Sequence, residues 1–327
     1  MTAPTRRITV LGTGGTVAAR SDAAGVLAPA TVPADLLSGV PVPGHVAVSA
    51  REVMAVDSAA LSLDDMGRIA DAAADALAGG ADGVVVLHGT DTLTESALVA
   101  DLHPALRTDP RPVLYTGAQR PADHPRPDGP ANLATALAAA AADTPCPGAA
   151  VVFAGQTLPV WGAAKVHTTD PDGFAAAGAA ADPVTAGLAA TRDRALAAMT
   201  GRTPGPWPRV DAVLLYPGVD AAAIVAARRA GARAIVLAAM GAGNANPAIA
   251  RAVAEATAAG VPIVVCTEVA HGPAFADYGG GGGGADLVAA GAVISPWLRT
   301  QQTRVLLAAL LAHGLGRDAI ARVLTEP

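Results

Sequence analysis

The chain has almost no lysine. Of its 22 basic residues only Lys165 is a lysine, and all the others are arginines. An arginine keeps its proton near neutral pH, whereas a lysine can lose it in a suitable environment. One use of a lone lysine is therefore proton transfer beside a nucleophile. The alternative is an ordinary surface lysine left by compositional drift.

Cysteines, long apolar runs and basic clusters are also scarce. Cys146 and Cys266 lie far apart and share no metal-ligand spacing with the seven histidines, so we expect free thiols in a reducing cytoplasm. No apolar run reaches the ~20 residues that span a bilayer, and residues 1–10 lack the apolar segment of a signal peptide. A net charge of −6 without a basic run argues against nucleic acid as a partner. We expect a cytoplasmic protein with neither a membrane nor a nucleic-acid partner.

The chain does contain a regular alternation of apolar runs and helical patterns. With 327 residues, 52% of them hydrophobic and 15% charged, it is long enough for two domains. In its first half we expect strands at residues 8–11, 46–56, 84–87, 112–115 and 151–154, and helices at 64–78, 97–102 and 128–142. This alternation is typical of a doubly wound, mostly parallel α/β sheet.

The pattern weakens after residue 186 and then resumes on a smaller scale. We predict an N-terminal catalytic α/β domain at 1–190, a linker at 191–209 and a smaller C-terminal α/β domain of about four strands at 210–327. The expected strands are 210–216, 234–239 and 262–266, and the expected helices are 220–231, 247–260, 303–313 and 317–324. The glycine run 279–284 is predicted to be a solvent loop too flexible to pack.

The stretch from Gly83 to Thr94, GVVVLHGTDTLT, is the centre of the first half. Its apolar β-branched run predicts a strand buried on both faces. The run ends in a histidine, two hydroxyls and a carboxylate, and Thr92 or Thr94 is placed to cap the following helix. Ligands bind beyond the carboxyl ends of such strands. The alternative is that these polar residues are only turn and cap residues.

A second polar loop, Gly12 to Thr16, follows the first predicted strand. Its three glycines allow the main chain to approach a ligand and leave amide protons for a developing oxyanion. It has neither the third glycine of a dinucleotide-binding loop nor the Gly-Lys-Ser/Thr of a phosphate loop. The irregular segment after Thr16 is either a mobile lid or an ordinary surface loop.

Six motifs in order resemble the bacterial L-asparaginase family, the two-domain amidohydrolases of types I and II. They are TGGT at 13–16, HGTDT at 88–92, TGAQRP at 116–121, DGPANL at 128–133, KVHTTD at 165–170 and GAGNAN at 241–246. The resemblance runs from residue 8 to the C-terminal helices. Each motif alone is weak, whereas the ordered set is specific.

The resemblance implies a mechanism. Thr16 aligns with the family's nucleophile, which attacks the side-chain amide carbon and forms an acyl-enzyme that water hydrolyses. Thr90, Asp91 and Lys165 align with a second triad, in which the lysine moves protons through the threonine hydroxyl. Asp91 also holds the substrate α-amino group, and Ser58 aligns with a residue that binds the α-carboxylate.

The resemblance also implies the surroundings of the site. Backbone amides around Thr90 and Ala118 are expected to bind the oxyanion and the amide. Asn246 matches an asparagine that supports the site from the C-terminal domain, in most members across a subunit interface. We therefore expect a homodimer or homotetramer that takes L-asparagine and possibly L-glutamine, and amide hydrolysis requires no metal or organic cofactor.

Two departures from the family pattern affect the functional prediction. The tyrosine of the type I lid motif is replaced by Val26, and Ser58 is followed by Ala59-Ala60 where type II members have Gln-Asp and type I members have Ser-Asp. The main hypothesis is an L-asparaginase of low affinity or modest activity. The alternatives are a weak or inactive relative that binds a small amino acid as a sensor or scaffold, and an amidase for a different asparagine-like substrate.

Overall fold

The computed structural model describes residues 5–15, 19–21, 27–29, 33–142, 144, 146, 148–178 and 183–325. The chain divides into two compact units, Met1–Ala176 and Ala177–Pro327, and each is described by itself. No helix among the described residues is both long and apolar enough to cross a membrane. Cys146 and Cys266, both described, form no disulfide.

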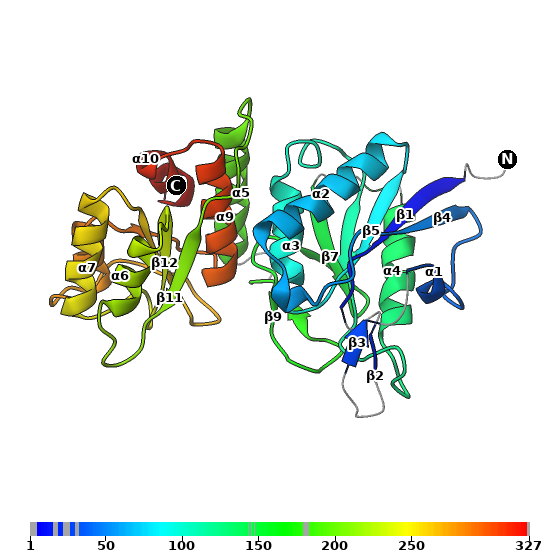
Figure 1. Ribbon diagram of the computed structural model, residues 1–327, viewed down its shortest axis with the longest axis horizontal. Coiled ribbons are helices and arrows are strands. Elements are labelled where there is room, and N and C mark those ends of the chain that lie inside the picture. Colours follow the sequence, from blue (N-terminus) through cyan, green and yellow to red (C-terminus); the bar gives the residue numbers. More distant parts are fainter. Residues whose placement is uncertain are drawn as a thin grey trace. The chain divides into compact units, whose positions relative to one another are not determined.

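The first unit is built on a six-stranded sheet (Figure 1). The strand order is β4 (Val46–Glu52), β1 (Arg6–Gly12), β5 (Gly83–Leu87), β6 (Val113–Thr116), β7 (Ala149–Phe153) and β8 (Gln156–Pro159). All neighbours pair in parallel except β7 and β8. The chain steps from β1 to β4 on one side and then to β5 on the other. The strand order therefore reverses between the carboxyl ends of β1 and β5, the usual place for a ligand in such a sheet.

Helices cover both faces of this sheet. One face carries α2 (Leu63–Ala78) and α3 (Leu93–Leu102), and the other carries α1 (Pro33–Leu36) and α4 (Gly129–Ala141). The reciprocal capping box of Ser62 and Asp65 begins α2. All ten residues of α3 are buried, since it lies between α2 and the sheet. The predicted doubly wound α/β fold is confirmed.

Three short segments complete the first unit. β2 (Ala19–Ser21) pairs antiparallel with β3 (Leu27–Pro29), which lies within the predicted lid or surface loop. β9 (Ala164–Lys165) pairs antiparallel with β10 (Phe174–Ala175), so that Lys165 lies opposite Phe174. A single turn of 3-10 helix, η2 (Ser58–Ala60), follows β4 after an irregular stretch.

The second unit has a four-stranded parallel sheet, as predicted. Its order is β11 (Val210–Leu214), β12 (Ala234–Ala239), β13 (Ile263–Thr267) and β14 (Val293–Ile294). The helices are α5 (Pro183–Met199), α6 (Ala222–Arg229), α7 (Pro247–Ala258), α8 (Gly284–Ala289), α9 (Thr300–Ala312) and α10 (Arg317–Thr325). Helices α6, α7 and α8 share one hydrophobic core with the strands, and α9 packs against β11, β12 and β13.

The prediction of a linker over 191–209 is wrong in its first part, because α5 continues to Met199. Along the chain, the first unit ends at Ala176 and the second begins at Ala177. The whole of α5 therefore belongs to the second unit and not to a domain ending at 190. The buried residues of α5 recur at helical spacing: Val184, Leu188, Thr191, Ala195 and Met199. Because this series includes a threonine and an alanine, its helical periodicity is weak in the sequence.

The glycine run 279–284 is also packed more closely than predicted. A Cβ on Gly282 would lie 2.4 Å from the Asn246 carbonyl carbon, and a Cβ on Gly283 would lie 2.1 Å from a neighbouring carbonyl oxygen. The Asp286 carboxylate accepts a hydrogen bond from the Gly283 amide at 2.9 Å. The second half of the run is buried, so the glycines there serve close backbone packing.

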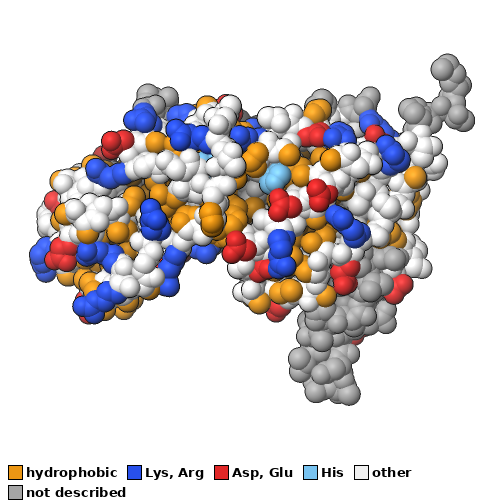
Figure 2. Space-filling model, turned by 45° about the horizontal axis from the view of Figure 1, so that its top comes forward, with side chains coloured by type: hydrophobic (Ala, Val, Ile, Leu, Met, Phe, Trp, Pro, Cys, Tyr) orange, Lys and Arg blue, Asp and Glu red, His pale blue; other side chains and the backbone are white. Residues whose placement is uncertain are grey.

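Figure 2 shows both acidic and basic side chains on this face of the molecule.

Candidate active site

The loop after β1 is tied to the end of β5. The Thr13 hydroxyl and amide both donate to the Leu87 carbonyl oxygen, at 3.0 and 3.1 Å. Gly14 and Gly15 have φ values of +96° and +82°, and a Cβ on Gly15 would lie 2.3 Å from the Gly89 Cα. The two loops therefore touch backbone to backbone, which only glycines at these positions allow.

Thr16 comes directly after this contact, but Thr16 and Val26 lie outside the described residues. The assignment of Thr16 as the nucleophile and the effect of Val26 on the lid therefore stay predictions. The described part of the loop brings the chain to Gly15, where it touches Gly89.

Lys165 connects two side chains that follow β5. Its Nζ donates to Thr90 Oγ1 at 2.8 Å and to Asp91 Oδ1 at 2.8 Å. Thr90 is 5% exposed, whereas the Lys165 and Asp91 side chains are 22% and 58% exposed. The three residues thus form a chain of contacts from a buried hydroxyl to a carboxylate open to solvent. Such a chain is able to hold a proton near Thr90 and a cationic group near Asp91.

The Lys165 strand is held by the turn that follows it. His167 Nδ1 accepts hydrogen bonds from the amides of Thr169 and Asp170 at 3.2 and 2.8 Å. The Gln119 side-chain amide donates to the His167 carbonyl oxygen at 3.0 Å. The motif at 165–170 is therefore a compact turn that is tied to the loop after β6.

Ser58 lies next to the same turn and is buried. Its Oγ accepts a hydrogen bond from the Asp91 amide at 3.3 Å, and its carbonyl oxygen accepts one from Thr92 Oγ1 at 2.8 Å. A Cβ on Gly89 would lie 2.5 Å from Ser58 Oγ. Ser58 and Asp91, the two residues predicted to bind the substrate backbone groups, are therefore neighbours. Ala59, the departure from the family pattern, is exposed beside them.

The predicted capping role of Thr92 or Thr94 is wrong. Thr92 is the N-cap residue of α3, but its side chain makes no capping bond and instead donates to Ser58. The Thr94 hydroxyl donates to Glu95 Oε2 at 2.8 Å. By donating to the Ser58 carbonyl oxygen, Thr92 ties η2 to α3.

The loop after β6 is positioned by the motif at 128–133. The Asp128 carboxylate accepts the amides of Gln119 and Arg120 at 3.0 and 2.8 Å, and Asn132 Nδ2 donates to the Gly117 carbonyl oxygen at 3.0 Å. The sequence indicates the motif but not this supporting role. The sequence signal from which this supporting role could be predicted is an Asp-x-x-x-Asn pair at the start of a helix that follows a polar loop.

The hydrogen bonds described above leave two backbone amides, those of Thr90 and Ala118, available to bind a ligand. Among the described residues, neither the Thr90 nor the Ala118 amide hydrogen has a hydrogen-bond acceptor. Both residues are buried, at 5% and 1% exposure. Buried amides without an acceptor are suited to bind a carbonyl or an oxyanion.

His88 has no role that the sequence alone indicates. Its ring is fully buried, with Nδ1 at 2.7 Å from the Gly89 carbonyl oxygen and its centroid at 6.0 Å from that of Tyr115. Burial lowers the pKa of His88 to about 4, against a smaller opposing effect of the Gly89 hydrogen bond. The imidazole is therefore neutral at pH 7. A histidine placed directly after a fully apolar strand is the sequence signal for such burial.

Asn246 belongs to the second unit, where its side chain is already engaged. Its Oδ1 accepts the Ile249 amide at 3.1 Å and caps α7, while its Nδ2 donates to the Val219 carbonyl oxygen at 2.8 Å. These bonds give the Asn246 side chain a structural role within its own unit. Its predicted contact with the substrate stays a prediction.

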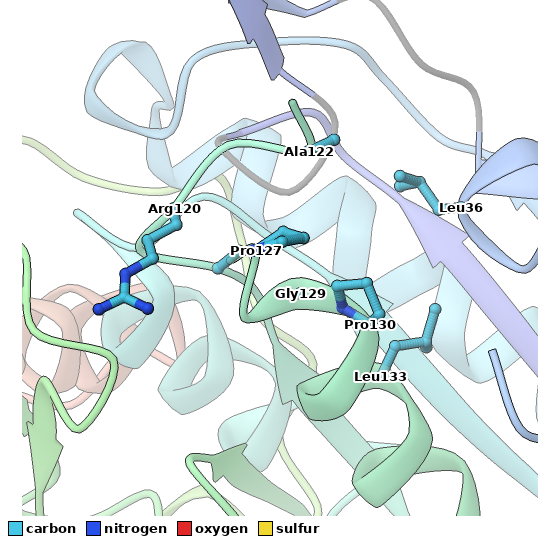
Figure 3. A pocket seen from close by; sticks show the side chains of 8 residues that line it. Leu36, Arg120, Ala122, Pro127, Gly129, Pro130 and Leu133 are labelled. Carbon is cyan, nitrogen blue, oxygen red and sulfur yellow. The ribbon is translucent and has the colours of Figure 1, made fainter. Parts of the chain in front are cut away.

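A small cavity of about 50 Å³ lies on the α1 and α4 side of the first unit (Figure 3). Pro127, Pro130 and Leu133 line it, and the Arg120 guanidinium points away from these side chains. The cavity is mainly apolar and has none of the triad residues in its lining, so it is a packing void behind Ala118. Within the described residues, no group of three or more His, Cys, Asp or Glu side chains is arranged to hold a metal ion.

Comparison with known protein families gives a match for both halves of the chain. Residues 7–187 match the model of the asparaginase N-terminal domain, and residues 209–324 match that of the glutaminase/asparaginase C-terminal domain. Two solved structures share the fold over 98% of this chain. They are the thermostable L-asparaginase from Thermococcus kodakarensis (TM-score 0.79, 24% identity, 97% of that chain) and a probable cytoplasmic L-asparaginase from Campylobacter jejuni (TM-score 0.78, 25% identity, 99% of that chain).

Relatives in sequence fall into two named groups. A probable L-asparaginase from Deinococcus radiodurans is 35% identical over 100% of this chain and 99% of that protein. A glutamyl-tRNA(Gln) amidotransferase component from Aeropyrum pernix is 31% identical over 81% of this chain and 66% of that longer protein. With matches that cover nearly the whole chain in sequence and in fold, this protein belongs to the two-domain L-asparaginase family.

Proposed function

We propose that the protein is an L-asparagine amidohydrolase that converts asparagine and water to aspartate and ammonia. The observation that carries the proposal is the position of Lys165 Nζ at 2.8 Å from both Thr90 Oγ1 and Asp91 Oδ1. An amide is a poor electrophile, so its hydrolysis needs a nucleophile, a proton carrier and an oxyanion site. The residues around β1, β5 and β6 supply candidates for all three.

In the proposed reaction, the Thr16 oxygen attacks the side-chain amide carbon while its proton passes through the Thr90 hydroxyl to the neutral amine of Lys165, and a tetrahedral oxyanion forms. The same path returns this proton to the leaving nitrogen. Collapse of this intermediate breaks the C–N bond, and the leaving nitrogen takes a proton and departs as ammonia. Water then attacks the acyl ester, releases aspartate and restores the Thr16 hydroxyl. Thr90 accepts a hydrogen bond from Lys165, so its own O–H is free to pass protons between Lys165 and the reacting groups.

Substrate recognition uses the adjacent pair Ser58 and Asp91. Lys165 engages Oδ1 of Asp91, and we assign the α-ammonium group of the substrate to the other carboxylate oxygen. Ser58 is assigned to the α-carboxylate. The amides of Thr90 and Ala118 are assigned to the oxyanion and the bound amide, in agreement with the lack of an acceptor for either among the described residues. Val26 and Ala59 remove polar groups, so we expect low affinity or a modest rate, with L-glutamine as a possible second substrate.

A second candidate is an amidase that acts on a different asparagine-like substrate. The similarity to relatives named as components of a glutamyl-tRNA(Gln) amidotransferase favours it, because the same fold then serves an amide of a larger molecule. A weak relative that binds a small amino acid without turnover is the third alternative. We further propose that the protein is cytoplasmic and forms a homodimer or homotetramer.

The test is ammonia release by the purified full-length protein from L-asparagine and, in parallel, from L-glutamine, up to tens of millimolar. Thr16→Ala serves as the blank, and Thr13→Ser, which keeps the hydroxyl bond to Leu87, is the matched control. Saturable release that disappears in Thr16→Ala alone is the expected result. Release equal in wild type and Thr16→Ala contradicts the assignment. Calorimetric titration with amino acids then separates binding without turnover from an amidase of other specificity.

A further inference from the structure

The His88 side chain makes one hydrogen bond that determines which ring nitrogen carries the proton. Nδ1 lies 2.7 Å from the carbonyl oxygen of Gly89, the next residue in the chain. A carbonyl oxygen only accepts hydrogen bonds, so Nδ1 must be the donor. In the neutral ring, Nε2 is then the nitrogen with the lone pair.

The Gly89 carbonyl belongs to the same peptide unit as the Thr90 amide. The described chain has no cis peptide bond, and in a trans peptide the C=O and N–H bonds point in opposite directions. A carbonyl held toward His88 therefore directs the Thr90 N–H to the other side. That N–H has no acceptor among the described residues, and its own residue carries the hydroxyl that Lys165 contacts.

The peptide is clamped in position by its neighbours. The Cα of Gly89 touches Gly15, and a Cβ on Gly89 would lie 2.5 Å from Ser58 Oγ. The His88 carbonyl oxygen lies 2.3 Å from the point that a Cβ on Gly117 would occupy. Because the loops from β1, β4 and β6 fix the position of this peptide, the His88 bond is left to determine the orientation of its plane.

We propose that His88 is a positioning residue that holds the Gly89 carbonyl with its Nδ1–H and thereby presents the Thr90 amide as an oxyanion donor. This inference rests on the proposed amidohydrolase function for the identity of the oxyanion. The Nδ1 contact itself is a property of the fold, which is measurable without turnover.

On the opposite side of the ring, no acceptor among the described residues requires a proton on Nε2. Nε2 is buried and has no hydrogen-bond partner among the described residues, and the same holds for the Thr116 hydroxyl. The Tyr115 ring lies 6.0 Å from the His88 ring, and burial raises the pKa of its phenol, which stays protonated.

Three substitutions distinguish a positioning role from a packing role. His88→Asn places an amide N–H near the Nδ1 position, His88→Gln places its amide near Nε2, and His88→Leu fills the space without a donor. We expect kcat to fall roughly 100- to 1,000-fold in the Gln and Leu variants, with KM changed by less than a few-fold, because removing one oxyanion donor has that effect. His88→Asn should keep most of kcat.

Thermal unfolding of all three variants provides the control for folding. A fall in kcat of the same size in the Asn and Leu variants, or one that follows Tm across the series, overturns the inference. So does a His88→Leu variant with wild-type kcat. Complete absence of Thr16-dependent ammonia release in the wild type refutes the proposed function instead, and the following measurement then decides the His88 contact alone.

The tautomer is measured directly by nitrogen-15 NMR of protein labelled at its seven histidines, with His88→Leu to assign the signal. The expected result is a protonated Nδ1 and an unprotonated Nε2 at His88, unchanged between about pH 5.5 and 8. A protonated Nε2, or a signal that titrates near the ordinary histidine pKa of about 6.5, overturns the inference.

Discussion

At the scale of single residues, the contacts of Lys165 explain why this one position keeps a lysine in a chain of arginines. Its ammonium group meets a buried hydroxyl and a partly exposed carboxylate at the same distance, 2.8 Å. A planar guanidinium presents several N–H groups at once and stays charged near neutral pH. Only a compact amine is able both to fit between these two acceptors and to exchange a proton.

Replacing this amine should separate catalysis from stability. We expect Lys165→Arg and Lys165→Met to lower kcat by roughly 100- to 10,000-fold, since both remove a proton carrier. The free energy of unfolding should change by less than about 1 kcal/mol in Lys165→Arg, because Asp91 is 58% exposed and such pairs contribute little. Steady-state kinetics and urea unfolding measure the two effects. Arg68→Lys on α2, which also replaces a paired base, is the control; a fully active Lys165→Arg contradicts the role.

His88 and Asn132 show a different kind of residue, one whose contribution is to hold a main-chain group. His88 contacts the Gly89 carbonyl, and Asn132 donates to the Gly117 carbonyl and accepts the Ala154 amide at 3.0 Å. Main-chain contacts of this kind depend on loop geometry. They are therefore invisible in the sequence even where the motif that contains them is recognised.

At the scale of elements, the sequence predicts the buried strands well. β5, β12 and β13 are fully buried and appear in the sequence as continuous apolar runs bounded by glycine, proline or polar residues. Helix α5 escapes prediction because its buried face uses alanine, threonine and methionine in addition to valine and leucine. A helix of that composition has little periodicity, although it buries one face.

The glycine run offers a test of packing inside one short segment. Gly282 and Gly279 both lack a positive φ, but a Cβ on Gly282 would lie 2.4 Å from Asn246 whereas one on Gly279 would meet nothing within 4 Å. We expect Gly282→Ala to lower the free energy of unfolding by about 1–3 kcal/mol, because the backbone must move apart.

Gly279→Ala is the matched control for that experiment. It should be neutral or stabilise the protein by up to about 1 kcal/mol, because alanine restricts the unfolded chain. Urea unfolding of both variants, followed at the same wavelength, gives the comparison. Equal stability of the two variants would show that the run is an open loop, as the sequence alone suggests.

At the scale of the whole molecule, the second unit exposes a group of large apolar side chains near the carboxyl edge of its sheet. They are Leu214, Tyr216, Val269, Phe275 and Tyr278. The sequence predicts a strand that ends at Tyr216, but β11 ends at Leu214 and Tyr216 is 55% exposed. Of these side chains, the Phe275 and Tyr278 rings stack at a centroid distance of 6.3 Å. Large apolar side chains that stay exposed are candidates for interfaces between protein molecules.

This surface supports the proposal that the protein is oligomeric. We expect light scattering coupled to size-exclusion chromatography to give at least twice the chain mass of 32.0 kDa. The double variant Leu214→Asp, Tyr216→Asp should shift the mass toward the monomer, because charges in an apolar interface are costly to bury. Val288→Asp, at an exposed position on α8, is the control. A wild-type protein that elutes with the mass of one chain contradicts the proposal.

The sequence by itself was sufficient for the family, the α/β class and the positions of most strands along the chain. Apolar runs and helical spacing are local patterns, and they report burial directly. The ordered motifs also identified Thr90, Asp91 and Lys165 as a set, although 74 residues separate the last two. Their roles, and those of Thr16 and Val26 outside the described residues, stay predictions.

Only the tertiary structure decided which groups touch. The contact of Gly15 with Gly89 depends on the register of β1 against β5, whereas the bonds of His88 and Asn246 depend on the geometry of the loops that carry them. Local patterns carry no information on that register. It follows from how the sheet and its covering helices pack together, which brings the carboxyl ends of β1 and β5 into contact.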